Sequence, residues 1–177
     1  YRMKKKTSHF MFAALAVALS AMTLTAFQSC SSSGCTENRN AVPLAEFLNP
    51  ADDKVISVDS ISISGVGQPG DSILSQAGQA VSQVYLPMRP THETVSWCFA
   101  YKWKQLDYPE LNDTITFDYK SIPFFASEEC GAYYKYHITR MDYTDHLIER
   151  VEILDSMVTN VDKVYVNIYF RVADGEQ

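Results

Sequence analysis

Apolar and polar residues alternate with a period of two along much of the chain, which is the pattern of strands that bury one face. The clearest stretch is 95–103, where five large apolar side chains from Val95 to Trp103 alternate with smaller or polar ones. Similar runs, separated by Gly, Pro, Asn and Asp, are 58–63, 115–119, 134–139 and 164–170, with shorter candidates at 42–48, 72–75 and 83–86. Eight or nine short strands with little helix predict an all-β fold, namely a two-sheet antiparallel β-sandwich.

The segment between Leu147 and Val158 is ambiguous. Its apolar residues recur at helical spacing, which predicts an amphipathic helix. Val151 and Ile153 also flank the polar Glu152, as they would in a strand. The periodicity therefore leaves both structures open.

The N-terminal pattern is different and predicts export. Lys4, Lys5 and Lys6 precede an apolar run over 10–27, and small polar residues follow. A basic start, an apolar centre and a small-residue end describe a secretory signal peptide, here residues 1–29. One alternative is a permanent membrane anchor, since about 18 apolar residues are the lower limit for crossing a bilayer. Cleavage after Ala21 or Ala26 would instead release a soluble periplasmic protein.

Cys30 resembles the lipidated cysteine of bacterial lipoproteins. Ser29 supplies the small residue that the pattern requires just before the cysteine, whereas Phe27 departs from the preferred Leu, Val or Ile. Acyl chains on Cys30 would hold the protein on a membrane. The predicted organisation is a signal peptide (1–29), a lipidated cysteine with a flexible tether (30–40), one β-sandwich domain (41–172) and a C-terminal tail (173–177).

Charge narrows the classes of partner. The 177 residues carry a net charge of −6, but the first 29 hold four basic groups and no acid, so residues 30–177 carry −10. Nonspecific nucleic-acid binding needs a basic face that displaces phosphate counterions. Docking on anionic headgroups needs a polybasic patch. The acidic body favours neither partner.

The order of several segments resembles a family of small, uncharacterised Bacteroidota lipoproteins, a domain of unknown function. The matching pieces are Cys35, 59–67, 71–74, 84–88, 113–119, the Glu-x-Cys-Gly motif at Glu128–Gly131 with the residues that follow, and 164–170. The resemblance implies fold and location but no activity. It also implies a Cys35–Cys130 disulfide and a strand over 149–155, and it suggests an outer-membrane protein as a partner.

Few residues suggest chemistry. Asp142, Asp145 and His146 lie within five residues and could hold Ca²⁺ or Zn²⁺, but a polar hairpin turn explains them more simply. We interpret Cys98, on the polar face of 95–103, as a half-buried thiol, with a Cys98–Cys130 disulfide as the alternative to Cys35–Cys130. The many aromatic residues fit a core, although Tyr165 and Tyr169 could be exposed. No nucleophile elbow, zinc helix, phosphate loop or dinucleotide fingerprint occurs, and we predict no cofactor.

We therefore expect a lipid-anchored protein without catalytic activity, with a structural or protein-binding role at the outer membrane. The periplasmic side is favoured because Ser31–Ser33, directly after Cys30, lack the acidic cluster that resembles a surface-export signal. The alternatives are a glycan-binding accessory lipoprotein and a metal-dependent hydrolase. A row of exposed coplanar aromatics would favour the first, and a pocket gathering Asp142, Asp145 and His146 the second.

Overall fold

The structure, a computed structural model, describes residues 40–67 and 73–171. These residues contain ten β-strands and one short 3₁₀ turn at Pro109–Leu111. The strands are β1 (Leu44–Leu48), β2 (Ile61–Gly65), β3 (Ile73–Ser75), β4 (Gln83–Tyr85), β5 (Thr94–Tyr101), β6 (Asp113–Ser127), β7 (Gly131–Tyr143), β8 (Ile148–Ile153), β9 (Met157–Val158) and β10 (Val164–Phe170). No helix in the described ranges is long and apolar enough to cross a membrane.

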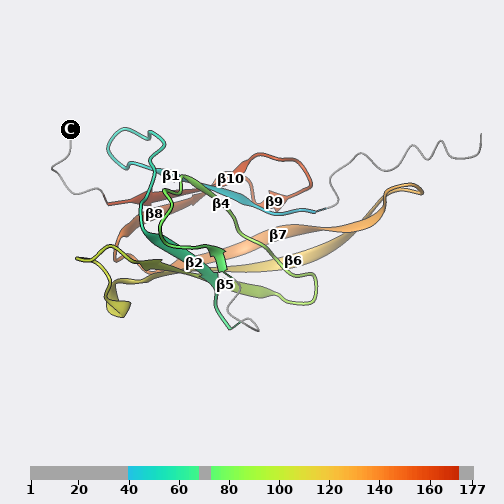
Figure 1. The fold of residues 1–177 in the computed structure, drawn as a ribbon. Coiled ribbons are helices and arrows are strands. Elements are labelled where there is room, and N and C mark those ends of the chain that lie inside the picture. Colours follow the sequence, from blue (N-terminus) through green and yellow to red (C-terminus); the bar gives the residue numbers. More distant parts are fainter. Residues whose placement is uncertain (1–39, 68–72, 172–177) are drawn as a thin grey trace, which may run out of the picture. The chain divides into compact units, whose positions relative to one another are not determined.

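Two sheets form the domain (Figure 1). The first has the order β4-β1-β10-β8, and the second has the order β3-β2-β5-β6-β7-β9. Their facing side chains make one continuous core. The predicted all-β two-sheet fold is confirmed, with ten strands in place of eight or nine.

One strand pair departs from the predicted antiparallel arrangement. β1 and β10 are parallel, with Phe47 opposite Ile168. Hairpins make neighbouring strands antiparallel, but nearly the whole domain separates the first strand from the last. That long connection removes the constraint, so β10 joins β1 in the parallel direction.

The alternating stretches bury the residues that their period predicts. Val95, Trp97, Phe99 and Tyr101 of β5 all face the core, where Trp97 meets Phe117 edge to face at 5.1 Å between ring centroids. Tyr165 and Tyr169 of β10 are buried as well, which answers the question left open by the sequence. Two residues of the alternating stretches do not face the core. Trp103 is exposed because β5 ends at Tyr101. Tyr134 is exposed because it lies on a part of β7 that the core does not cover.

The ambiguous segment is the strand β8, as the family resemblance implied. Ile148 and Val151 are both buried although they are three residues apart. The register explains this spacing, because Ile148 pairs with Phe170 and Arg150 pairs with Tyr169, which leaves Glu149 as an extra residue. A β-bulge turns the strand so that residues three apart share a face. The helical periodicity came from this bulge.

β6 and β7 form the longest hairpin. They pair from Ile115 opposite Tyr143 to Ser127 opposite Gly131. The turn closes at Gly131, whose φ of 71° lies in the region that glycine adopts readily. β9 pairs with β7 at Tyr136 and His137, and beyond this point β6 is the one strand that pairs with β7 among the described residues. We call the part between residues 121 and 135 the arm; in Figure 1 it reaches past the other labelled strands.

Candidate functional site

The three predicted metal-binding candidates do not form a common site. Asp142, at the end of β7, makes an ion pair with Arg140 of the same strand. The Asp145 side chain is exposed, and the His146 ring places Nδ1 3.1 Å from the backbone oxygen of Asn112. Within 40–67 and 73–171, no three His, Cys, Asp or Glu side chains lie close enough together to hold a metal ion. All three residues lie at the end of β7 or in its connection to β8.

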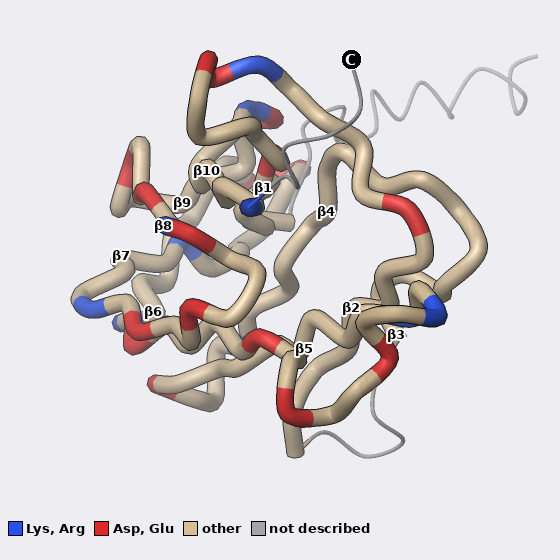
Figure 2. The backbone as a smooth tube through the Cα atoms, turned by 90° about the vertical axis from the view of Figure 1, so that its left-hand side faces the viewer, with Lys and Arg blue, Asp and Glu red and all other residues tan. Residues whose placement is uncertain are grey.

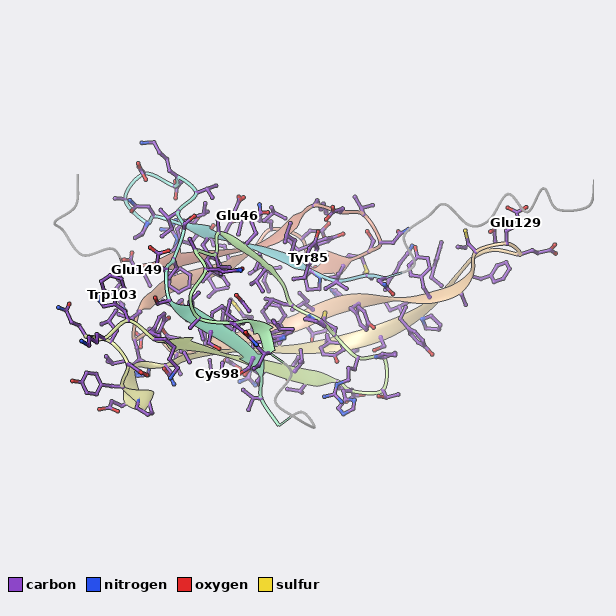
Figure 3. All side chains as sticks on the ribbon, in the orientation of Figure 1. Glu46, Tyr85, Cys98, Trp103, Glu129 and Glu149 are labelled. Carbon is purple, nitrogen blue, oxygen red and sulfur yellow. The ribbon has the colours of Figure 1, made fainter. Side chains whose placement is uncertain are left out.

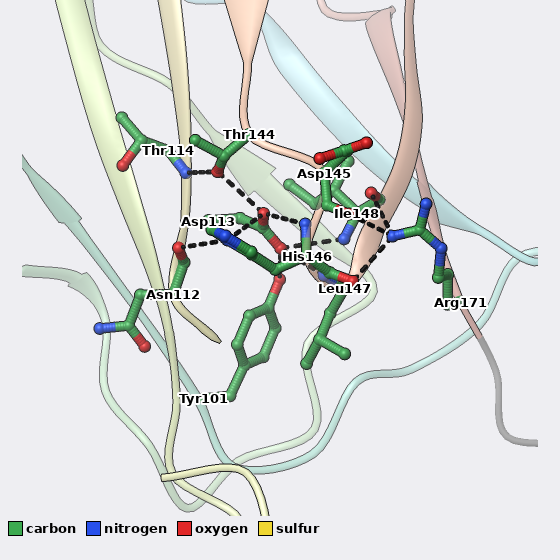
Figure 4. A network of polar contacts seen from close by, with 10 residues as sticks. All are labelled: Tyr101, Asn112, Asp113, Thr114, Thr144, Asp145, His146, Leu147, Ile148 and Arg171. Carbon is green, nitrogen blue, oxygen red and sulfur yellow. Dashed lines mark hydrogen bonds and ion pairs between the residues drawn. The ribbon is translucent and has the colours of Figure 1, made fainter. Parts of the chain in front are cut away.

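The turn is organised by a residue that the sequence analysis missed. Asp113, at the start of β6, is fully buried and lies at the centre of a polar network (Figure 4). Its Oδ1 accepts hydrogen bonds from Thr144 Oγ1 at 2.8 Å and from the His146 backbone N–H at 2.9 Å. Its Oδ2 accepts from Tyr101 Oη at 2.7 Å and from the backbone N–H groups of Leu147 and Ile148 at 2.8 and 2.9 Å. One carboxylate thus holds the whole connection from β7 to β8.

A second side chain binds the carbonyls of the same connection. Arg171 follows β10, and its Nη1 donates to the backbone oxygens of Asp145, His146 and Ile148, the second at 2.7 Å and the third at 3.3 Å. Asp113 accepts from the backbone N–H groups and Arg171 donates to the backbone oxygens. Together they fix the connection against both sheets.

The geometry makes Asp113 a structural group. Five donors occupy its two oxygens and no part of it reaches solvent, so it has no free position for a reacting molecule. Burial, together with the neighbouring Asp113 carboxylate, raises the pKa of the Tyr101 phenol far above its usual value. The sequence does indicate that Asp113 faces the core, because it lies at every second position with the core residues Ile115, Phe117 and Tyr119. A carboxylate at a core-facing position needs several donors around it.

The two described cysteines differ. Cys98 is a free, half-buried thiol on the face of β5 opposite the aromatic core, as predicted, so the alternative Cys98–Cys130 pair is wrong. Burial raises the pKa of Cys98, which disfavours the reactive thiolate. Cys130 is buried at the end of the arm and is not a free thiol. Its predicted partner Cys35 and the predicted lipid site Cys30 lie outside the described residues.

The arm exposes several large apolar side chains. Phe125 is the most exposed of them at 64%, and Tyr134, Phe124 and Ile122 are each about 40% exposed. Phe124 lies against Tyr133 at 5.2 Å between ring centroids, and Lys135 Nζ lies 3.3 Å above the Phe124 ring. Glu129 is at the far end of the arm (Figure 3). This surface was not predicted, because the run Ile122–Phe125 contains a proline and does not alternate.

Two shallow cavities lie on either side of the chain where it enters β1. One, of about 440 Å³, separates Asn40–Val42 from Ala132, Tyr134 and Tyr136 of β7. The other, of about 330 Å³, lies beside Tyr85, whose hydroxyl donates to Asp162 at 2.8 Å. A tyrosine ring next to a carboxylate is a combination that can bind a sugar.

Acidic and basic positions are intermixed along the described residues. In the view of Figure 2, acidic positions are spread over several loops and strands, and basic positions occur on several of them too. A face that binds nucleic acid gathers Lys and Arg. On the side shown, acidic positions lie among the basic ones.

Residues 60–170 match a protein family that is described as a family of unknown function, DUF6452. The matched region runs from the residue before β2 to the end of β10 and so includes Asp113 and the whole arm. Comparisons with curated proteins and with solved structures find no match.

Proposed function

The chain belongs to DUF6452, a family of unknown function, and we propose that it is a lipid-anchored protein without catalytic activity that binds another protein at the periplasmic side of the outer membrane. Cys30 carries the lipid in this proposal. Its support is the basic and apolar N-terminal pattern, together with the small residue before the cysteine.

The exposed apolar surface of the arm is the observation that carries the protein-binding role. Phe125, Phe124 and Tyr134 project from a paired ribbon, so little conformational entropy is lost when a partner covers them. Aromatic side chains of this kind dominate the energy of protein interfaces. Glu128 and Glu129 at the turn are exposed, which favours a partner with an apolar centre and a basic or polar rim.

Two of the candidate catalytic side chains have partners within the protein, which supports a binding role. Asp142 is paired with Arg140, and the ring of His146 places its Nδ1 at hydrogen-bond distance from the backbone oxygen of Asn112. Catalysis needs acids, bases or a nucleophile within mutual reach. Replacing Asp142, Asp145 and His146 together by Ala should leave the cellular role intact. Loss of that role in a folded, lipidated triple variant would favour the hydrolase alternative.

A Cys35–Cys130 disulfide is part of this proposal. Cys98 is free, so the partner of Cys130 would be Cys30 or Cys35, and lipid on Cys30 leaves Cys35. The disulfide would close a loop of about 95 residues. In the loop-closure account, the lower entropy of the unfolded chain would stabilise the folded protein by on the order of 4 to 5 kcal/mol. Cys35 would then fasten the tether to the end of the arm.

The cavity beside Tyr85 supports a second candidate function, glycan binding. Tyr85 is about half exposed, and its hydroxyl and Asp162 offer polar atoms next to the ring. In this alternative, a Tyr85→Ala variant loses retention on purified peptidoglycan while Phe125→Ser keeps it. The protein-binding proposal predicts no retention of either variant or of the parent protein.

Affinity capture from native membranes tests the leading proposal. The lipidated full chain is compared with Phe125→Ser and with Tyr108→Ser, which changes an exposed aromatic residue away from the arm. We expect a defined set of membrane proteins to copurify with the parent protein and with Tyr108→Ser, and to be lost with Phe125→Ser. Capture of the same set by all three proteins would contradict the arm as the binding surface.

A further inference from the structure

One face of the arm and of its base combines exposed apolar side chains with positive charge. Residues directly opposite each other in an antiparallel pair lie on the same face, and so do residues two apart on one strand. Ile122 lies opposite Lys135, and Lys120 lies opposite His137. We call Lys120, Ile122 and Phe124 of β6 together with Lys135 of β7 the cationic face. Its three β6 residues are exposed and Lys135 is half-buried, so the face offers a partner both apolar carbon and ammonium groups.

The two lysines of the cationic face form no ion pair with a carboxylate of the described residues. The Lys135 Nζ instead lies 3.3 Å from the centre of the Phe124 ring. Other described lysines pair with an aspartate at 2.7 or 2.8 Å, namely Lys54, Lys102 and Lys163. A protein that covers Phe124 also removes water from the Lys135 ammonium group. Because a buried charge without a partner is costly, the covering protein must bring an acceptor, and a carboxylate is the strongest one.

The turn of the arm carries the opposite charge. Glu128 and Glu129 are exposed, and Glu129 lies at the far end of the hairpin (Figure 3). Lys135 lies four residues after Gly131 on β7, which is about 13 Å along a strand. A layer of anionic lipid headgroups that approached Lys135 would also meet the two glutamates, which would repel it. A protein segment can match both signs, because its own charges have fixed positions.

We propose that the cationic face binds a segment of the partner protein that carries a carboxylate opposite Lys135 and apolar side chains over Phe124. A basic group of the same segment lies opposite Glu129. The inference rests on the protein-binding role proposed for the arm and names the chemistry of its partner. The order of the charges also gives the contact a direction. A segment that runs the other way along the arm places like charges together, which disfavours it.

Three short synthetic peptides with the same apolar centre test this chemistry. The first has Lys at one end and Glu at the other, the second has Lys at both ends, and the third has Glu at both ends. We expect the lipidated full chain, held on beads in detergent micelles, to retain the first peptide at least about tenfold better than the other two. The difference should largely disappear in about 1 M salt, where the Debye length is about 3 Å.

Charge reversal on the cationic face supplies the matched variants. Lys135→Glu makes both ends of the aromatic surface negative, so this variant should retain the peptide with Lys at both ends best. Such a result is a gain of binding, which a misfolded arm does not produce. Lys135→Arg should keep the preference of the parent protein because it preserves the charge. Lys104→Glu should also keep it, since this exposed lysine lies in the connection from β5 to β6.

Equal retention of the three peptides by the folded parent protein, or retention of none, would overturn the inference. An unchanged preference in Lys135→Glu would do the same. Displacement of the first peptide by phosphatidylglycerol but not by phosphatidylcholine would also overturn it, because the face would then bind an anionic lipid. The proposed function has a separate readout, which is the loss of the captured membrane proteins with Phe125→Ser.

Discussion

Five hydrogen-bond donors around one buried carboxylate make Asp113 the most sensitive polar residue of the domain. In Asp113→Asn, one acceptor oxygen becomes an NH₂ group that faces N–H or O–H donors. At least one backbone N–H group then loses its acceptor, and an unsatisfied buried donor costs about 1–3 kcal/mol. We expect the free energy of unfolding to fall by on the order of 3 kcal/mol, measured by urea titration.

The matched control for Asp113→Asn is Asp142→Asn, which lies on the other strand of the same hairpin. Asp142 is exposed, and its ion pair with Arg140 lies in solvent, where such pairs contribute little. The urea concentration at the midpoint of unfolding should be the same for Asp142→Asn as for the parent protein. Equal losses in the two variants would contradict the structural role of Asp113.

The raised pKa of Tyr101 predicts that the stability of the protein falls at alkaline pH. Its pKa is raised in the folded protein, whereas an unfolded tyrosine ionises near pH 10. Above about pH 10 the unfolded chain therefore binds fewer protons than the folded one, and stability falls as pH rises. This one group contributes up to about 1.4 kcal/mol per pH unit. The decline between pH 10 and 11 should be shallower in Tyr101→Phe, and parallel curves would show that Tyr101 ionises in the folded protein.

At the scale of the element, the hairpin β6–β7 combines a buried half with an exposed half. Phe117 is fully buried and Phe125 is 64% exposed, although both lie on β6. Phe117→Ala should lower the free energy of unfolding by about 3–5 kcal/mol. Phe125→Ser should leave stability within about 0.5 kcal/mol of the parent protein. A large loss of stability in Phe125→Ser would indicate that the arm belongs to the core.

Period-two alternation predicted the strands wherever one face meets the core, as in β5 and the start of β6. It failed where another constraint decides the pattern. The bulge at Glu149 gave β8 a helical spacing, and the exposed arm extended β6 to Ser127 although Pro123 breaks the alternation. Asp113 was missed because its donors come from distant positions, mainly residues 144–148. Contacts of that kind depend on the register of the hairpin, which alternation alone does not define.

At the scale of the whole molecule, the proposal predicts that Cys30 fastens the domain to a membrane. Cys30→Ala should yield a protein without acyl chains that separates from membranes on fractionation, because one thiol carries the whole lipid anchor. Mass spectrometry of the N-terminal peptide is the measurement. Cys98→Ser serves as the control and should remain acylated. An unmodified Cys30 in the parent protein would contradict the anchor.

The central claim is that the arm binds a protein at the membrane, and site-specific photo-crosslinking in living cells tests it most directly. A photoreactive phenylalanine analogue replaces Phe125 in one lipidated full chain and the exposed Tyr108 in another. The account predicts a discrete crosslinked product with a membrane protein from position 125 and none from position 108. Absence of a product at position 125, in protein that is folded and anchored, would contradict it.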